Sequence, residues 1–328
     1  MKMEISFWKD FFKGQVAFPI HTVTSQAQMI TYSDASNRAW GGYTICVGKR
    51  ECQGNWLESE CGPHTSSTWR EIRAANLVLA SLMACIQGRV VLHHSDNQNV
   101  IRAILNGSRN ERIHREVIEI YGKCQQFGVK LEAEGLPREL NESADVLSKE
   151  VDKEDYRLNQ KVFSAVDKLW GLHTIDCFAS RLSRQTNRYI SRSANPDCVA
   201  VGAFSLSWAG ENCWLFHPPR LIAKTLQHLQ EAKGHGSLLV PVWPSQSWWP
   251  LLLEENRSVF ASYIADVREI EWFPELFTAC GMLQSVFTDG KFTSRVLVLR
   301  LCFAECCRQN GQTDSMAEDL PKLLLQIQ

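Results

Sequence analysis

Alternating apolar and polar residues dominate the first quarter of the chain. Residues 28–47 alternate in this way and end in a glycine-containing turn region, and the stretch ECQGNWLE follows a short VGKR turn. Alternation with a period of two residues is typical of half-buried strands joined by tight turns. The pattern therefore predicts an antiparallel meander of three strands.

Helical periodicity replaces the alternation after Thr68. In the stretch 69–86, apolar side chains recur at helical spacing, and Gly88 follows as a stop signal. The same signals predict further elements, in the order strand, helix, helix, strand, helix, at 89–96, 97–107, 109–128, 129–137 and 141–149. This order predicts an α/β fold in which helices flank a mixed sheet.

The composition shifts toward tryptophan and proline after the charged stretch KEVDKEDYR, which suggests a domain boundary near residue 152. Apolar runs beyond it predict four strands of a second α/β unit, at 173–180, 213–219, 236–243 and 294–303. We expect four parts: a connector at 1–27, a first domain at 28–150, a second domain at 151–307 and a tail at 308–328.

The composition of the 328 residues is that of an ordinary globular protein, with 45% hydrophobic and 22% charged residues and a net charge of -1. No signal peptide and no apolar run of the roughly 18 residues needed to span a membrane is present. We expect an intracellular protein, cytoplasmic or nuclear, that does not bind membranes. A balanced charge leaves nucleic-acid binding to local patches.

The twelve cysteines are scattered through a long chain, which favours reduced thiols over a disulfide framework. Two groups invite a zinc hypothesis, but neither has the paired spacing of a zinc knuckle or ribbon. These groups are Cys302, Cys306 and Cys307, and Cys46, Cys52, Cys61 and His64.

Four acids stand at positions that an α/β sheet brings to one edge. Asp34 and Asp96 close strands, Glu71 lies in the first long helix, and Asp145 begins a later helix. Three of them have a structural alternative: a capping box with Thr68 for Glu71, a cap of the following helix for Asp96, and a first-turn acid for Asp145. Together, four converging carboxylates would need cations to offset their repulsion. Oxygen ligands suit Mg²⁺, and we expect two ions, with Mn²⁺ as a substitute.

The stretches YSDAS with WGG, WREIRAA, HHSDNQNVI and LNESADVLSK resemble, in order and spacing, the four active-site motifs of retroelement ribonuclease H. The resemblance covers about residues 28–150 and implies that Asp34, Glu71, Asp96 and Asp145 are the metal-binding catalytic acids. It also places Asn97 and Asn141 beside the site. The histidine-bearing loop of many relatives is replaced here by EGLPRELNE.

The helix expected at 109–128 carries several basic residues. Some members of the ribonuclease H family have a basic element at this place that binds the RNA–DNA hybrid. We name Arg109, Arg112 and Arg115 as candidate nucleic-acid contacts, although interleaved glutamates can instead pair with them on a solvated surface.

The second domain is similar to the region after ribonuclease H in DIRS-type and related tyrosine-recombinase retrotransposons. That region resembles phage-type adenine methyltransferases, whose signature is Asn or Asp, two prolines and an aromatic residue. In this chain the strand acid is Asp176, and the signature reads His217, Pro218, Pro219, Arg220. The first and last positions have lost the required chemistry, so we expect a methyltransferase-like fold without activity.

The leading hypothesis is a metal-dependent endonuclease that hydrolyses the RNA strand of RNA–DNA hybrids, with a reverse transcriptase acting in trans as a possible partner. A catalytically silent nucleic-acid-binding or scaffold protein of retroelement origin is the alternative. A third hypothesis is that the second domain is an active methyltransferase, but the residues at His217 and Arg220 disfavour it.

Overall fold

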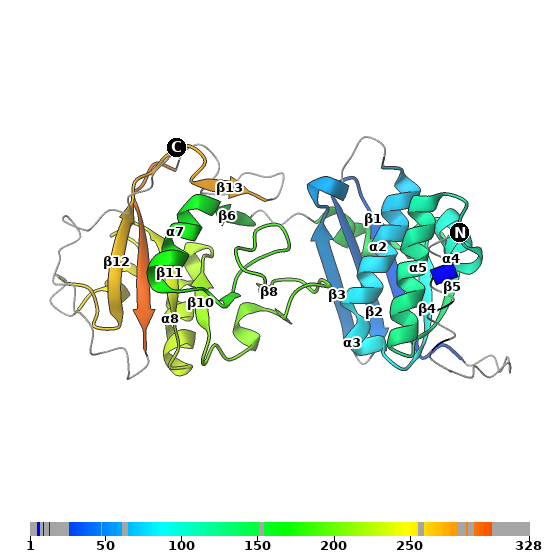
Figure 1. The fold of residues 1–328 in the computed structure, drawn as a ribbon, viewed down its shortest axis with the longest axis horizontal. Coiled ribbons are helices and arrows are strands. Elements are labelled where there is room, and N and C mark those ends of the chain that lie inside the picture. Colours follow the sequence, from blue (N-terminus) through cyan, green and yellow to red (C-terminus); the bar gives the residue numbers. More distant parts are fainter. Residues whose placement is uncertain are drawn as a thin grey trace. The chain divides into compact units, whose positions relative to one another are not determined.

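A computed structural model describes residues 26–46, 48–60, 65–150, 154–254, 259–280, 287 and 292–303, with four isolated residues near the N-terminus. The chain divides into two compact units (Figure 1). One contains Met1–Glu150 and Ser193–Asp197, and the other contains Val151–Arg192 and Cys198–Gln328.

The first unit is built on a five-stranded mixed sheet in the order β3-β2-β1-β4-β5. Its strands are β1 (Met29–Ala35), β2 (Ala39–Cys46), β3 (Gly48–Asn55), β4 (Val90–Ser95) and β5 (Lys130–Gly135). The first three form an antiparallel meander, while β4 runs parallel to both β1 and β5. The predicted mixed α/β architecture is therefore confirmed.

Helices fill the connections between these strands. The main ones are α2 (Ser67–Ser81), α4 (Gln98–Asn106), α5 (Glu111–Gln126) and α6 (Glu142–Lys149), with the short α3 (Met83–Ile86), η1 (Glu58–Glu60) and η2 (Arg138–Leu140). The helix predicted at 69–86 is interrupted at Leu82, which ends α2 and precedes α3. The N-cap of α2 is Ser66 and not Thr68. The Ser66 hydroxyl accepts a hydrogen bond from the Trp69 backbone amide at 3.1 Å.

Two consecutive glycines of β2 allow helices to approach both faces of the sheet. A Cβ on Gly41 would lie 2.5 Å from the Leu147 backbone of α6, and one on Gly42 would lie 2.5 Å from Val78 of α2. Because neighbouring side chains of a strand point to opposite faces, α6 and α2 lie on opposite sides of the sheet. Asp34 pairs with Gly41 and so faces α6.

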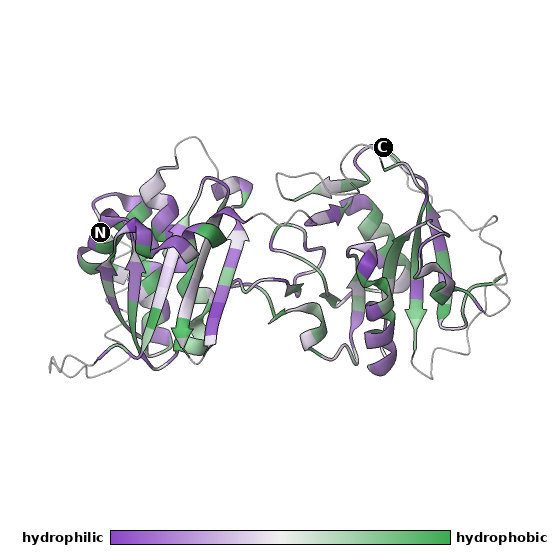
Figure 2. Cartoon of the chain, turned by 180° about the vertical axis from the view of Figure 1, so that it is seen from behind, coloured by the Kyte–Doolittle hydropathy of each residue, from purple (hydrophilic) through white to green (hydrophobic). Residues whose placement is uncertain are grey.

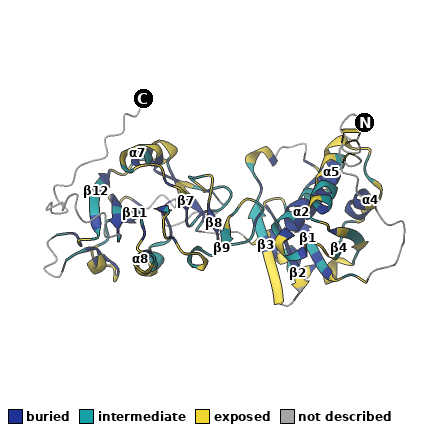
Figure 3. Cartoon of the chain, turned by 60° about the horizontal axis from the view of Figure 1, so that its bottom comes forward, coloured by how far each residue is buried: buried dark blue, intermediate teal, exposed yellow. Residues whose placement is uncertain are grey.

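The core of the first unit lies between the sheet and α2, where Ile72, Val78 and Leu79 are buried. Figure 3 shows α2 as mostly buried and the beginning of β3 as exposed. Figure 2 shows β3 as a mainly hydrophilic strand at the edge of its sheet. Charged edge strands of this kind discourage pairing with other chains.

The second unit contains a five-stranded sheet in the order β12-β14-β11-β10-β7. Its strands are β7 (Ile175–Asp176), β10 (Asn212–Leu215), β11 (His235–Pro241), β12 (Ile264–Ile270) and β14 (Val296–Cys302). The first three are parallel to one another, and β14 is antiparallel to both β11 and β12. Four of these strands lie at the predicted places, whereas β12 was missed because charges interrupt its sequence IADVREI.

Smaller elements complete this unit. They are α7 (Gln160–Trp170), α8 (Ile222–Glu231), β6 (Tyr156–Leu158), β8 (Ile190–Ser191), β9 (Ala200–Val201), β13 (Phe277–Ala279), η3 (Ala203–Ser205), η4 (Pro219–Leu221) and η5 (Trp249–Leu252). Trp248 and Trp249 are buried in the core of the second unit. Ser193–Asp197 belongs to the first unit, where Ala194 forms a bridge with Cys52 of β3.

Several predictions lie outside the described residues. These include most of the connector, the tail, and Cys61, His64, Cys306 and Cys307 of the zinc hypothesis. Seven of the described cysteines are free, and Cys302 is disulfide-bonded, contrary to the expectation of reduced thiols throughout. Within the described segments, no helix has the length and apolar character needed to cross a membrane.

Candidate metal centre

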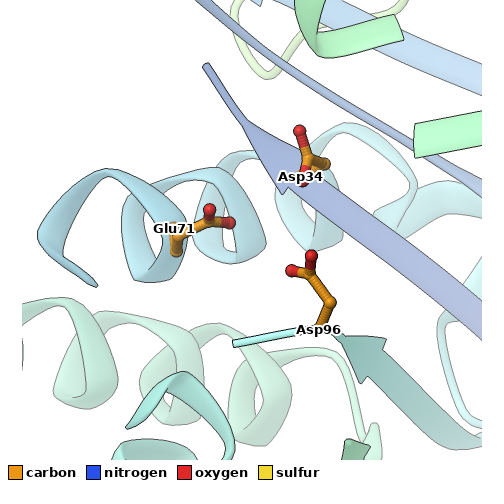
Figure 4. Close-up of side chains that lie close together, drawn as sticks. All are labelled: Asp34, Glu71 and Asp96. Atoms are coloured by element: carbon orange, nitrogen blue, oxygen red, sulfur yellow. The ribbon is translucent and has the colours of Figure 1, made fainter. Parts of the chain in front are cut away.

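Three carboxylates converge at one edge of the first sheet. Asp34 lies near the end of β1, Asp96 directly follows β4, and Glu71 reaches the same place from the second turn of α2 (Figure 4). One oxygen of each lies within 4.8 Å of the others. The parallel pairing of β1 with β4 brings the two aspartates together, and the packing of α2 on the sheet adds the glutamate.

Asp34 is held in a buried setting, with 6% of its surface exposed. Its Oδ2 accepts a hydrogen bond from the Ser148 hydroxyl at 2.5 Å. Burial raises the pKa of Asp34 above its usual value, and the nearby charges of Asp96 and Asp145 raise it further, while the Ser148 hydrogen bond opposes the rise. Such a group is costly to ionise unless a cation compensates.

The pKa of Glu71 is strongly raised. Burial, followed by repulsion from Asp34 and Asp96, raises the pKa of Glu71 to about 9. Its Oε2 is buried and accepts no hydrogen bond from the described residues. The capping-box alternative is wrong, because Ser66 caps α2. An orphaned carboxylate oxygen that faces two other acids is suited to a cation.

Asp96 was also open to a structural interpretation as the cap of α4. The actual cap is Asn97, whose Oδ1 accepts the Asn99 amide at 3.0 Å. Asp96 is thereby left to face Asp34 and Glu71, while Asn97 is engaged in the helix start beside the site.

Asp145, the fourth predicted acid, does not join the group of three. Its carboxylate forms ion pairs with Lys149 of the same helix at 2.6 Å and with Arg138 at 3.5 Å. It nevertheless contributes to the raised pKa of Asp34, which places its charge near the site. The structure thus brings together three of the four predicted acids and leaves the fourth beside them, paired with bases.

The donor set fits a hard divalent cation. All three groups offer carboxylate oxygens, the ligands that Mg²⁺ and Mn²⁺ favour, and no softer ligand belongs to the cluster among the described residues. A positive ion there would offset the cost of burial and the mutual repulsion that raise the pKa of Asp34 and Glu71.

The other residues predicted to contact nucleic acid in the first unit differ in their exposure to solvent. Asn141 is fully buried, and its side-chain amide donates to the Ser33 carbonyl at 3.0 Å, which favours a structural role over contact with nucleic acid. Arg109, Arg112 and Arg115 are exposed. Arg112 stacks over Trp69 at 4.9 Å, and Arg115 pairs with Glu111 at 3.7 Å.

Sequence reasoning missed two features that hold the site. Ser148 contacts Asp34 from α6, and Arg73 on α2 binds Glu60 and Glu116, each at 3.1 Å. The Arg73 ion pairs anchor the helix two residues from Glu71. Ser148 lies within the quoted motif LNESADVLSK, but only the fold reveals which serine or acid reaches β1.

The positions whose sequence resembles a methyltransferase signature are engaged in internal contacts of the second unit. Both oxygens of Asp176 accept backbone amides, from Phe178 at 3.3 Å and Gln185 at 3.0 Å, and burial raises its pKa to about 7. His217 is buried and donates from Nδ1 to the Pro218 carbonyl at 3.0 Å, while Thr225 donates to its Nε2 at 2.9 Å.

The remaining positions of the signature are Pro218, Pro219 and Arg220. Pro218 precedes η4 and Pro219 opens it, and Arg220 forms an ion pair with Glu154.

A chain of hydrogen bonds in the second unit has the order of a hydrolytic triad. Asp167 Oδ1 lies 2.7 Å from His173 Nδ1, and His173 Nε2 lies 2.7 Å from Ser237 Oγ. Ser237 is fully buried in β11. A nucleophile must reach its substrate, so we assign these bonds to the packing of α7 and β11.

No protein-family profile and no curated protein matches the chain. Similar solved structures include ribonuclease H1 from the halophilic archaeon Halobacterium salinarum, with 18% identity and a TM-score of 0.30 over 36% of this chain and 92% of that one. The LC11 ribonuclease H1 in complex with an RNA/DNA hybrid has 17% identity and a TM-score of 0.32, over 36% and 92%. The foamy viral protease-reverse transcriptase in complex with an RNA/DNA hybrid has 13% identity and a TM-score of 0.29, over 40% and 22%.

Proposed function

We propose that the first unit is a divalent-metal-dependent endonuclease that hydrolyses the RNA strand of RNA–DNA hybrids. The observation that carries the proposal is the cluster of Asp34, Glu71 and Asp96, whose ligand oxygens lie within 4.8 Å of one another. The order and spacing of the quoted sequence motifs, which resemble those of retroelement ribonuclease H, supply the substrate class.

The three acids have a common part in this proposal. Asp34, Glu71 and Asp96 would hold the metal, with Mg²⁺ as the natural ion and Mn²⁺ as a substitute. Bound divalent ions activate water for attack on a phosphodiester and stabilise the leaving oxygen. Because burial makes Asp34 and Glu71 costly to ionise alone, a bound cation favours the ionised form that acts as a ligand.

Asp145 would complete the set. Its present partners Lys149 and Arg138 are exposed side chains, and exposed ion pairs contribute only about 0 to 1 kcal/mol, so a bound metal can compete for the carboxylate. Asp145 is therefore proposed as the fourth metal ligand, from the helix that already contacts Asp34.

The proposed partner is an RNA–DNA hybrid, with Arg109, Arg112 and Arg115 as phosphate contacts and Asn97 beside the scissile bond. A retroelement origin, and a reverse transcriptase acting in trans, follow from the motif resemblance. For the second unit we propose a methyltransferase-like scaffold without activity, supported by the internal contacts of Asp176, His217 and Arg220. Saturable micromolar binding of S-adenosylmethionine would contradict that assignment.

Cleavage of a labelled hybrid by the full chain tests the endonuclease proposal. We expect cleavage of the RNA strand in Mg²⁺ or Mn²⁺, no cleavage after chelation, and no cleavage of duplex DNA. Asp34→Asn should lower the rate by at least about 100-fold, since each ~1.4 kcal/mol of lost transition-state stabilisation is a factor of ten. Ser81→Ala, a change on the far end of α2, serves as the control. A wild-type protein that folds, binds metal and leaves the hybrid intact would overturn the proposal.

A further inference from the structure

The C-terminal end of α6 contacts the first strand at the metal centre in a way that the acids alone do not explain. Ser148 is fully buried, and its hydroxyl lies 2.5 Å from Asp34 Oδ2 and 2.9 Å from the Asp145 carbonyl oxygen. A hydroxyl carries one proton, so it donates to one acceptor at a time. The shorter contact, to an acceptor that is charged when it binds metal, takes that proton.

Hydrogen bonds connect α6 and its N-cap to the backbone and side chains of residues on both sides of Asp34. The Ser36 hydroxyl donates to the Ser148 carbonyl at 2.6 Å, and the Asn141 amide donates to the Ser33 carbonyl at 3.0 Å. Gly41 lets the backbone at Leu147 and Ser148 approach the sheet closely. These contacts fix the Ser148 hydroxyl relative to β1, so that the direction of its hydrogen bond is set by the fold.

We propose that Ser148 is a positioning residue for the metal centre, which orients the Asp34 carboxylate by occupying Oδ2 and leaves Oδ1 for the metal. This inference rests on the proposed function, because it takes Asp34 to be a metal ligand. Partners of this kind hold ligating carboxylates in one rotamer, and their loss typically costs 10- to 100-fold in metal affinity or activity. Without the hydroxyl, Asp34 is free to turn between orientations that bind the metal well and poorly.

A purely structural role for Ser148 predicts something different. If the hydroxyl only satisfied a buried acid or closed the end of α6, its removal would lower the stability of the unit and the fraction of folded protein. The affinity of the folded protein for metal would stay the same. Metal affinity, measured independently of cleavage, therefore separates the two roles.

The test compares Ser148→Ala, Ser148→Thr and the control Ser81→Ala in the full chain. Ser81 is a good match, because its hydroxyl also bonds within a helix, to the Leu77 carbonyl at 2.6 Å, and lies away from the three acids. The probe is Mn²⁺ alone, titrated by electron paramagnetic resonance in the absence of nucleic acid. Melting temperatures of the metal-free proteins report on stability in parallel.

We expect Ser148→Ala to weaken Mn²⁺ binding about tenfold, with Ser148→Thr restoring most of the affinity and Ser81→Ala leaving it unchanged. Equal Mn²⁺ affinities for Ser148→Ala and wild type would overturn the inference, even if the alanine variant melts at a lower temperature. Absence of Mn²⁺ binding by the wild type would overturn it as well. Failure of the wild type to cleave hybrid while these affinities differ would overturn only the proposed function.

Discussion

At the scale of single residues, burial decides what each titratable group can do. Glu71 and Asp34 lose solvent and face one another, so the pKa of each is raised, and the pair is suited to a cation. His217 is also buried, but both of its ring nitrogens have partners that suit the neutral ring. The two acids are therefore suited to bind a cation, whereas the His217 ring forms internal hydrogen bonds in the second unit.

The neutral ring of His217 predicts a pH dependence of stability. Burial lowers its pKa to about 4, below the ordinary value of 6.5, so the unfolded chain binds a proton first as the pH falls. The stabilisation is full above about pH 6.5 and is lost as the pH falls toward 4, with a total on the order of 3 kcal/mol. His217→Gln should show a shallower decline of melting temperature over this range. Equal slopes for variant and wild type would contradict the assignment of a buried neutral ring.

At the scale of secondary-structure elements, the close approach of α6 to β2 is what brings Ser148 to Asp34 and leaves Asp145 beside the three acids. Gly41→Ala would place a Cβ 2.5 Å from the Leu147 backbone, so α6 must move. We expect a loss of about 1 to 3 kcal/mol in stability. Metal affinity should also fall, because the hydrogen bond from Ser148 to Asp34 depends on this approach.

Urea unfolding and Mn²⁺ titration of the Gly41→Ala protein provide the measurement. Gly42→Ala is the comparison, since its Cβ would meet the Tyr32 backbone oxygen of β1 and, on the opposite face from α6, Val78 of α2. A Gly41→Ala protein with unchanged stability and metal affinity would show that α6 can shift without consequence.

Helices and strands with a regular spacing of apolar residues were predictable from the sequence. Elements that depend on tertiary contacts were not. The meander, α2, β4 and β5 follow from alternation and helical spacing, and the acids that close β1 and β4 follow from their positions at the ends of those strands. The charged strand β12 depends on its pairing with β14, which comes later in the sequence. The hydrogen bond between Ser148 and Asp34 likewise requires the packed position of α6, which no local pattern encodes, whereas the pair of Asp145 with Lys149 is local to that helix.

At the scale of the whole molecule, a net charge of -1 leaves any grip on nucleic acid to local surfaces such as α5. Charge reversal at Arg112 and Arg115 should weaken hybrid binding and flatten its salt dependence, by about one unit of slope for each phosphate that the protein no longer neutralises. Arg89→Glu is the control, because Arg89 lies at the opposite end of β4 from Asp96.

Filter binding across a range of salt concentrations, with chelator present to prevent cleavage, measures these slopes. If the Arg112 and Arg115 variants keep the wild-type slope, α5 is a solvated surface on which Arg112 contacts Trp69 and Arg115 pairs with Glu111.

A crystal structure of the protein soaked in Mn²⁺, with anomalous scattering to locate the metal, tests the central claim most directly. We predict anomalous density between the carboxylates of Asp34, Glu71 and Asp96, with oxygen ligands and with Asp145 turned from Lys149 toward the metal. Two ions about 3.5 to 4 Å apart would match a phosphodiester-cleaving centre. An intact protein whose three carboxylates stay close together without bound metal at millimolar Mn²⁺ would contradict the account.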